Sequence, residues 1–478
     1  MHDQFEITHK DVFGRIGKFF TPHGPIETPA LLPVVNPNVT LIEPHELRRM
    51  GAQGLMTNAY VIYRNSRLRE AALSEGVHAL LGFNGPIMTD SGSFQLSTYG
   101  EIEVPSNEIV VFQRDIESDI GTPIDIPTPP DAPFEQTVSE LNTTLERIQE
   151  ATAYCGRKML LAAPIQGSTH LDLRERHARM LSELNADLYP IGAVVPLLES
   201  YRYADLSRVI MACKTGLTLN KPTHLFGAGH PMMFALAVAL GCDLFDSAAY
   251  AIYARDGRYL APSGTYKLGN LTYLPCSCPV CSKADSDLTE RELAEHNLRV
   301  SLAELKTIKQ AIVEGQLWEL VERRCQHPAL LRALRTVQKG CAPFEAIEPT
   351  GRSFLYTCTE SAARPAVKRY SQRLRNIELT GRVLVTTDKE RTRDLEREFD
   401  MTLLMKAPFG PYPKQLAETY PVGQSEVPDP DWASIKSALR TLIDLIRSKN
   451  IEATFAYDER WIHDDLAELS SSATLVPF

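Results

Sequence analysis

Three cysteines crowd into one short segment of the sequence, and a histidine follows at a spacing that suits a metal site. The segment CSCPVC holds Cys276, Cys278 and Cys281. Thiolates this close together repel one another unless a soft cation binds them, and a closed tetrahedral site needs a fourth ligand. His296 is the next histidine and falls on a predicted helix, so we predict a structural Cys3His zinc (Zn2+) site. The alternatives are three buried or redox-active thiols, or His327 as the fourth ligand.

Two aspartates end apolar runs that have the character of buried strands. Asp90 follows PIMT in a segment where Gly92 lets the chain turn back, and Asp246 ends CDLFD. Each one alone also fits an ordinary aspartate-initiated turn. As a pair, the two carboxylates suit glycosidic chemistry, in which one attacks the anomeric carbon and the other moves the proton.

These aspartates belong to a series of short apolar runs that alternate with helix-like segments from residue 30 to about 246. Such alternation is typical of repeated βα units and a parallel sheet. The eight predicted strands are residues 30–35, 53–57, 86–89, 122–126, 158–165, 187–194, 223–228 and 242–246. They predict a TIM (β/α)8 barrel, whose active site lies at the carboxyl ends of the strands. The residues at or just after those ends are Asn36, Asn58, Asp90, Asp125, Gln166, Gly192, Gly227 and Asp246.

The chain beyond the last barrel strand divides into a zinc-binding insertion and a second domain. We predict a hairpin over 251–268 that turns at Asp256-Gly257, and a helix over 287–315 that ends at Gly315. The barrel rhythm is lost near 341–365, so the predicted domains are a catalytic barrel over 1–345, with its zinc-binding segment at 274–315, and a small α/β domain over 346–478. That second domain has predicted strands at 382–387, 401–409 and 451–457 and a helix at 429–450.

Composition places the chain among ordinary globular proteins and limits its partners. Of 478 residues, 44% are hydrophobic and 23% charged, and no apolar run is long enough to span a membrane, so we expect a cytoplasmic protein without a membrane partner. Its nine cysteines fit a reducing compartment. A net charge of -10 argues against coating nucleic acid indiscriminately. Cations do cluster between Arg323 and Arg382, either as a local RNA footprint or as a solvated helix face.

Several motifs, in this order along the chain, closely resemble those of the tRNA-guanine transglycosylases. They are TDSGSFQL, PIQGSTHLDLR, GAVVPLLESY, HLFGAGHP, GCDLFDS and the CSCPVC segment with its HNL. PVVNPN, DIPTPPD and PLLESY look like the archaeal branch, which inserts 7-cyano-7-deazaguanine at the archaeosine position in the D-loop of tRNA, the first step of archaeosine biosynthesis. The resemblance covers roughly residues 5–340 and weakens in the tail.

The resemblance implies a role for each carboxylate. Asp246 would be the nucleophile that bonds covalently to the ribose, and Asp90 the general acid/base for the departing guanine and the incoming base. A carboxyl beside another carboxylate has a raised pKa, which suits the proton carrier. Asp125 suits the N1-H and amino donors of a deazaguanine, while the Gln166 side chain and the backbone around Gly192 and Ala193 would supply N-H groups to O6.

The remaining implied contacts concern stacking and RNA. Phe94 and Phe226 would stack on the two faces of the base, and core packing is the alternative. Ser91 would hold Asp125 or the base edge by its hydroxyl. Arg255 and Arg258 would hold the backbone of a tRNA whose target base is flipped into the pocket. Asn36 and Asn58 would line the mouth of the pocket.

The chain also departs from the family, and other functions compete. The interval from Cys281 to His296 is shorter than usual, and archaeal members often end in a PUA domain, for which the sequence up to Phe478 leaves no room. We therefore expect no PUA domain, and either a separate PUA-domain protein or a homodimer in compensation. The competing functions are a catalytically silent tRNA-binding accessory subunit, an archaeosine synthase paralogue and a retaining glycoside hydrolase.

Overall fold

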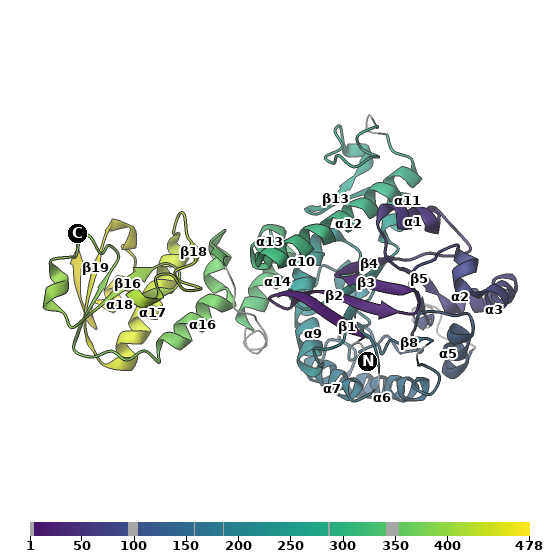
Figure 1. Cartoon of the computed structure of the whole chain (residues 1–478), viewed down its shortest axis with the longest axis horizontal. Helices are drawn as coiled ribbons and strands as arrows, with labels where there is room; N and C mark the ends of the chain where they lie inside the picture. Colours follow the sequence, from purple (N-terminus) through teal and green to yellow (C-terminus); the bar gives the residue numbers. More distant parts are fainter. Residues whose placement is uncertain (1–3, 94–103, 157, 185, 285–286, 341–352) are drawn as a thin grey trace. The chain divides into compact units, whose positions relative to one another are not determined.

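A computed structural model of the chain describes residues 4–93, 104–156, 158–184, 186–284, 287–340 and 353–478 (Figure 1). The protein divides into two compact units, Met1–Val337 and Gln338–Phe478. The predicted domain boundary at 345/346 lies outside the described residues. None of the helices in the described part of the chain combines the length and apolar character that a membrane span needs.

Parallel strands form the centre of the larger unit. Within the described ranges they pair as two four-stranded sheets, ordered β5-β6-β7-β8 and β4-β11-β10-β9. Single parallel bridges join the two sheets, from Val34 to Met56 and from Ala162 to Leu188. The strands are β4 (Ala30–Pro33), β5 (Leu55–Asn58), β6 (Ile87–Asp90), β7 (Ile120–Gly121), β8 (Leu160–Leu161), β9 (Tyr189–Ile191), β10 (Thr223–Leu225) and β11 (Leu244–Ser247).

The strand predicted at 122–126 is placed wrongly. The paired residues are Ile120 and Gly121, which precede it. Pro123 has no N-H to give to a ladder, and the backbone N-H of Ile126 donates to the Thr144 hydroxyl at 3.0 Å instead of to a neighbouring strand. Asp125 therefore lies in the loop that follows the strand.

Helices surround these strands in the larger unit (Figure 1). They are α1 (Pro44–Met50), α2 (Ala59–Arg64), α3 (Ser66–Leu81), α5 (Ser106–Asp115), α6 (Phe134–Ala151), α7 (Leu171–Ser182), α8 (Val195–Glu199), α9 (Tyr203–Gly216), α10 (Phe234–Ala239), α11 (Ala249–Arg255), α12 (Glu290–Glu314), α13 (Leu317–Arg324) and α14 (Pro328–Lys339). The longer ones bury an apolar face, as in α6, where Leu141, Leu145 and Ile148 are buried.

An N-terminal antiparallel sheet that the sequence did not predict covers the amino ends of the parallel strands. It consists of β1 (Phe5–Asp11), β2 (Gly14–Thr21) and β3 (Gly24–Thr28). Phe5, Phe19 and Ile26 pack into the same apolar cluster as inward-facing residues of the parallel strands. Arg15 Nε donates to Asp243, which directly precedes β11, at 2.9 Å. The sheet therefore closes the end of the strands opposite to the predicted site.

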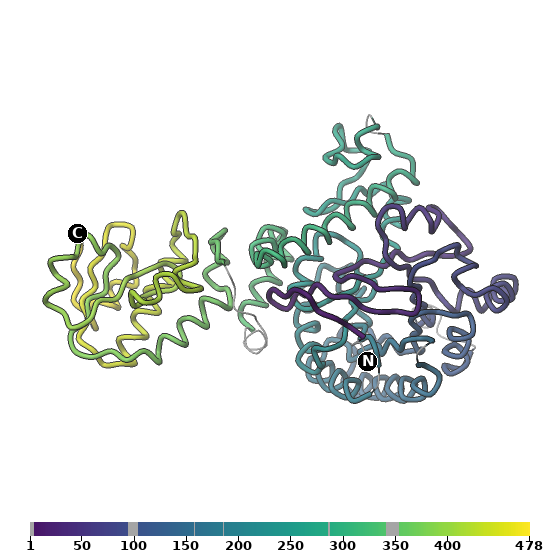
Figure 2. Tube along the Cα trace, viewed as in Figure 1, coloured from purple at the N-terminus to yellow at the C-terminus, as the bar shows by residue number. Residues whose placement is uncertain are grey.

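The segment after β11 differs from the predicted hairpin over 251–268. Residues Ala249–Arg255 form helix α11, because Tyr250 and Ala254, four residues apart, are buried on one face. Asp256-Gly257 ends this helix, and Gly257 takes the left-handed conformation with φ 64°. The hairpin is shorter, with β12 (Arg258–Ala261) and β13 (Gly264–Lys267), and it projects from the ring of helices beside α12 (Figure 2).

Helix α12 confirms the predicted helix and shows why it begins and ends where it does. The Thr289 side chain accepts from the backbone of Glu292, and the Glu292 side chain accepts from the backbone of Thr289, which forms a capping box. Gly315 ends the helix with φ 72°.

The smaller unit is an α/β fold, as predicted, around a five-stranded sheet in the order β17-β16-β15-β19-β20. The predicted strands and helix are confirmed, and Asp431 caps α17 by accepting from Ser434 N. Its elements are β14 (Phe354–Leu355), α16 (Pro365–Leu374), β15 (Arg382–Thr386), β16 (Met401–Lys406), β17 (Gly410–Pro413), β18 (Ser425–Glu426), α17 (Trp432–Lys449), β19 (Glu452–Tyr457), α18 (Asp465–Leu469) and β20 (Ala473–Pro477). Short 3-10 turns of the smaller unit occur at Thr359–Ala363, Leu395–Glu398, Lys414–Leu416 and Glu459–Trp461, and those of the larger unit at Pro231–Met233 and Leu268–Asn270.

Candidate active site

Asp90 is the last residue of β6, and the neighbouring strand β5 ends beside it. Asn58 is its partner in the strand register, and the Asn58 side-chain amide donates to Asp90 Oδ2 at 3.3 Å. The oxygen of the same amide accepts from Val61 N at the start of α2. Asn58 is thereby held by the helix cap while it orients the Asp90 carboxylate.

The charge of Asp90 depends on its neighbours. Burial raises the pKa of Asp90 to about 7, and the negative charges of Asp125 and Asp246 add to that rise. Backbone N-H groups of Ser91 and Gly92 act in the opposite direction, because they stabilise the carboxylate. Asp90 therefore gains and loses a proton near neutral pH, and three carboxylates lie within electrostatic reach of one another.

Asp246 lies near the end of β11 and is held from β10. Its Oδ1 accepts from the backbone N-H of Gly227 at 2.9 Å and lies 2.9 Å from His224 Nε2. The His224 ring is buried and packs edge-on against Phe226, with ring centroids 4.8 Å apart. His224 was not predicted, although it stands two residues before the predicted Phe226, a spacing that puts both side chains on one face of an extended chain.

Asp125 is held by two side chains from different loops. The Gln166 amide donates to Asp125 Oδ2, and the Ser93 hydroxyl accepts from the backbone N-H of Asp125 at 3.0 Å. Burial raises the pKa of Asp125, while hydrogen bonds from Ser93 and Gln166 oppose the rise. The Ser91 hydroxyl donates to Pro123 O at 3.1 Å, so it anchors the loop that carries Asp125. Ser93 was not predicted.

Gln166 is fully buried and keeps one acceptor free. Its backbone N-H donates to His177 Nδ1 at 3.0 Å. Burial lowers the pKa of His177 to about 3, so the ring stays neutral and acts as an acceptor. In the described part of the chain, Gln166 Oε1 is buried without a hydrogen-bond partner. A buried free acceptor of this kind is suited to a ligand donor.

Gly192 contributes space to the site. A Cβ at this position would lie 2.3 Å from Gln166 Nε2 and 3.3 Å from Asp125 Oδ2. The Gly192 N-H already donates to Ile165 O at 3.1 Å, so it belongs to the sheet. Ala193 follows with φ 56°, and among the described residues its N-H has no hydrogen-bond partner.

Arg174 is a buried cation that the sequence did not single out. Its guanidinium donates to the carbonyl oxygens of Ile165 at 2.7 Å, Ser168 at 2.8 Å and Gly192 at 3.0 Å. It therefore fixes the two loops that carry Gln166 and Gly192. Burial lowers the pKa of Arg174, and the negative charge of Asp125 partly offsets this.

The other predicted site residues are less closely involved. Phe94 lies outside the described residues. Phe226 is half-buried and packs against the apolar cluster inside the strands. Asn36 accepts from the backbone of Asn38 at 2.9 Å. Arg255 is exposed at the end of α11, and the Arg258 guanidinium lies over the Tyr253 ring at 5.1 Å.

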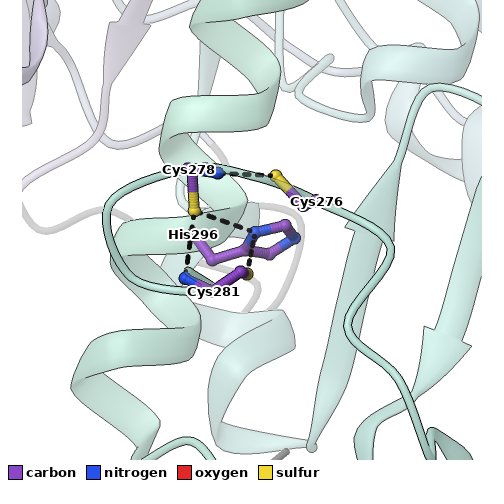
Figure 3. Close-up of side chains that lie close together, drawn as sticks. All are labelled: Cys276, Cys278, Cys281 and His296. Atoms are coloured by element: carbon purple, nitrogen blue, oxygen red, sulfur yellow. Dashed lines mark hydrogen bonds between the residues drawn. The ribbon is translucent and has the colours of Figure 1, made fainter. Parts of the chain in front are cut away.

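The structure brings the predicted metal ligands together. The ligand atoms of Cys276, Cys278, Cys281 and His296 all lie within 4.8 Å of one another (Figure 3). His296 Nδ1 is 3.2 Å from Cys281 Sγ and 3.6 Å from Cys278 Sγ. Its other nitrogen, Nε2, lies 3.0 Å from Leu260 O, an acceptor, so Nε2 carries the ring proton. The lone pair of Nδ1 then points toward the sulfurs. Three sulfurs and an imidazole nitrogen in this arrangement fit a tetrahedral metal ion.

The next residue of α12 extends this junction. Asn297 accepts from Leu260 N at 2.9 Å and donates to Arg258 O at 3.0 Å, so two consecutive residues of α12 hold strand β12. The alternative ligand His327 is exposed, with its ring stacked on Tyr201, and is not part of the group.

Carboxylates gathered at the carboxyl ends of parallel strands, in a unit that also contains a group able to hold a metal ion, define the class as an α/β protein with a carboxylate-lined candidate site. Comparison with known proteins identifies the family. Residues 11–329 match the family described as "Queuine tRNA-ribosyltransferase". The chain therefore belongs to the tRNA-ribosyltransferase family, as its motifs indicated.

Curated relatives extend the similarity over nearly the whole chain. The tRNA-guanine(15) transglycosylase of Methanosarcina mazei is 50% identical over 99% of this chain and 98% of its own length. The protein of the same name from Archaeoglobus fulgidus is 49% identical over 93% of each chain. That of Haloferax volcanii is 48% identical over 99% of this chain and 94% of its own length.

Proposed function

We propose that this protein exchanges a guanine in archaeal tRNA, at the archaeosine position of the D-loop, for 7-cyano-7-deazaguanine. The observation that carries the proposal is the trio of Asp90, Asp125 and Asp246, with the pKa of Asp90 near 7. The relatives that are about 50% identical are named for guanine exchange at tRNA position 15, which supports the same reaction here.

The chemistry divides between two carboxylates. Asp246, held by the Gly227 N-H and next to His224, attacks C1′ of the ribose, and the bond from C1′ to guanine breaks. Asp90 in its protonated form gives its proton to the departing guanine, and then accepts the proton of the incoming base as that base attacks C1′ and releases Asp246. Every proton taken up is returned, so the exchange needs no net acid, base or redox partner.

Base recognition rests on Asp125, Gln166 and Ala193. The Asp125 carboxylate accepts from the N1-H and amino group of the base. O6 accepts from the second N-H of the Gln166 amide, whose first N-H is donated to Asp125, and from the Ala193 N-H, which has no partner among the described residues. Gly192 gives the room for the heterocycle, and Phe226, with Phe94 as its predicted counterpart, stacks on the ring.

The fold and the metal group serve this site. The two sheets with their connecting bridges support a closed (β/α)8 barrel, with the carboxylates at its mouth.

One structural Zn2+ would be held by Cys276, Cys278, Cys281 and His296. The ion would tie the hairpin to α12 near Arg255 and Arg258, which are the proposed contacts to the tRNA backbone. A separate PUA-domain protein or a homodimer would strengthen the binding of tRNA.

The experiment is incorporation of labelled base into unmodified archaeal tRNA by the full chain. Labelled guanine and labelled 7-cyano-7-deazaguanine are tested separately, with and without an added PUA-domain protein. Incorporation of either supports base exchange, and incorporation of guanine alone rejects the deazaguanine substrate. No incorporation under any condition rejects the reaction and favours the accessory subunit or the archaeosine synthase.

The covalent step has its own test. Incubation with tRNA and denaturation should retain a protein–RNA adduct in the wild type, and Asp246→Ala should abolish it. Asp172→Ala, at an exposed position of α7, is the matched control and should keep the adduct. An adduct that persists in Asp246→Ala assigns the nucleophile elsewhere.

A further inference from the structure

A second cluster of metal-ligating side chains lies at the opposite end of the strands from the three carboxylates. It consists of His23, His78 and Asp119, whose ligand atoms lie within 4.8 Å of one another. Asp119 directly precedes β7, His23 lies in the turn between β2 and β3, and His78 in the last turn of α3. The proposed function uses none of them.

The carboxylate is fully buried and faces a nitrogen of each histidine. His23 Nδ1 is 3.1 Å from Asp119 Oδ1, and His78 Nε2 is 3.2 Å from Oδ2. The backbone also fixes this carboxylate, because Ile87 N donates to Oδ2 at 2.8 Å and His23 N to Oδ1 at 2.7 Å. The three ligand atoms are thus held by three separate elements.

The hydrogen bonds of His78 indicate that a cation lies between its ring and the Asp119 carboxylate. Its Nδ1 lies 3.1 Å from Phe83 O, an acceptor, so Nδ1 carries a proton. In the neutral ring Nε2 then presents a lone pair to an anionic oxygen, and within the described residues Nε2 is buried without a hydrogen-bond partner. Either a proton or a metal ion must lie between His78 and Asp119.

The packing of the two rings suits one shared cation. The His23 and His78 rings lie 3.7 Å apart between centroids and 30° from parallel. Two imidazolium rings at this distance repel each other, so the two rings do not both carry a second proton. One cation bound to both nitrogens and the carboxylate satisfies all three.

We propose that His23, His78 and Asp119 form a second divalent metal site, of the two-histidine, one-carboxylate type, that takes Zn2+ or a similar transition metal. The separations of 3.1 and 3.2 Å suit ligands that share one ion at roughly 2.0–2.2 Å each. The His23 side chain is 40% exposed, which leaves a fourth position for water. The ion ties the N-terminal sheet to α3 and β7, so it stabilises the fold at a distance from the base-exchange chemistry.

The test is metal stoichiometry of the full chain, with cobalt as a spectroscopic probe. The wild type should bind two equivalents of Zn2+ or Co2+. Only the Cys3His equivalent should show a sulfur-to-cobalt charge-transfer band, because the second site has nitrogen and oxygen ligands. His23→Gln should remove the second equivalent, weakening its binding by more than about 100-fold, and keep the charge-transfer band.

His45→Gln, at an exposed position of α1, is the matched control and should keep two equivalents. His78→Gln should behave as His23→Gln does, and if it fails to fold, the exposed His23 variant still decides the outcome. A single equivalent in the wild type shows that the cluster is only a proton-linked ion pair. Two equivalents in both His23→Gln and the wild type place the second ion elsewhere, and either result overturns the proposal.

Discussion

Asp90 is surrounded by groups that act on its proton in opposite directions. Burial and two nearby carboxylates favour the protonated form, while the Asn58 amide and the backbone after β6 favour the carboxylate. The result is a pKa of about 7, which leaves both forms populated at neutral pH. A group that must donate and then accept a proton within one catalytic cycle works best in this range.

Replacing Asp90 by Asn should lower activity and raise stability. Loss of the proposed proton carrier should reduce kcat by about 10²–10⁴-fold. The pKa of Asp90 rises from 3.8 to about 7 on folding, so the folded state binds this proton more tightly. The stability it contributes is present below pH 3.8 and is lost as the pH rises through 7. The neutral Asn avoids that loss, so at pH 8 the variant should be about 1–3 kcal/mol more stable by urea unfolding.

The stability gain of this variant should disappear in acid, where Asp90 is protonated in both states. Asp172→Asn, at an exposed site, should change neither activity nor stability measurably. Equal stability of Asp90→Asn and wild type at pH 8 would contradict the raised pKa.

Adding one methyl group at Gly192 should impair base binding. The new Cβ would meet Gln166 Nε2 at 2.3 Å and displace the amide from Asp125. We expect kcat/KM for the free base to fall about 10–100-fold, mainly through KM, with a native circular dichroism spectrum. Gly156→Ala has open space around its Cβ and is the control. An unchanged KM in Gly192→Ala would place the base elsewhere.

At the residue scale, strand-end position correctly predicted where Asp90 and Asp246 lie, at the ends of β6 and β11, whereas Asp125 was predicted at the end of a strand that was placed wrongly. Strand-end position and motif spacing did not reveal Ser93, His224 or Arg174. Arg174 lies on an amphipathic helix whose sequence gives no sign that its guanidinium turns inward to bind three backbone carbonyls. Positioning groups of this kind depend on loop geometry, which local sequence patterns do not encode.

At the element scale, α12 links the metal group to the hairpin. His296 and Asn297 are consecutive residues, one facing the three cysteines and the other bonded to the backbone of β12. Buried thiols need a cation to hold them as thiolates, and burial raises the pKa of Cys281 to about 12. Metal binding and docking of the hairpin should therefore be coupled.

Removal of the metal by a strong chelator, or by Cys278→Ser, should loosen this junction. We expect a loss of at least about 2 kcal/mol in unfolding free energy, and faster amide hydrogen exchange confined to β12, β13 and the start of α12. Cys155→Ser, outside the group, is the control for cysteine removal. Metal-free protein with native exchange rates in the hairpin would refute a structural role.

The elements with strong hydrophobic periodicity, such as α12, α17 and most parallel strands, were predictable from sequence. The errors came where a tertiary contact decides the conformation. Tyr250 and Ala254 bury one face of α11 in a segment where the Asp256-Gly257 pair indicated a hairpin, and Pro123 shortens β7. Strands β1–β3 were missed, because Phe5, Phe19 and Ile26 find their apolar partners in parallel strands that are distant in the sequence.

At the scale of the whole molecule, the smaller unit carries a basic cavity without a role in the base-exchange chemistry. Its volume is about 920 Å³, and its lining includes three cations, Arg369, Arg373 and Lys414, and one acid, Glu378. Arg369 and Arg373 belong to the cluster of cations between Arg323 and Arg382, for which the sequence suggested either an RNA footprint or a solvated helix face. Cations in excess over acids favour contact with a polyanion, so we expect this cavity to bind the tRNA backbone.

Reversing two of these charges should weaken tRNA binding without slowing the chemistry. Arg373 and Lys414 are exposed, so Arg373→Glu with Lys414→Glu should fold normally. Because ion pairs with phosphates supply binding energy that is equal in the ground and transition states, KM for tRNA should rise while kcat and KM for the free base stay unchanged. The slope of log KM against log salt should shrink by about 1 for each phosphate that no longer meets a cation. The control for net charge is Arg393→Glu with Arg397→Glu, two exposed reversals outside the cavity lining that make the same change in charge. An equal rise of KM in that variant would show that the cavity has no particular part in binding.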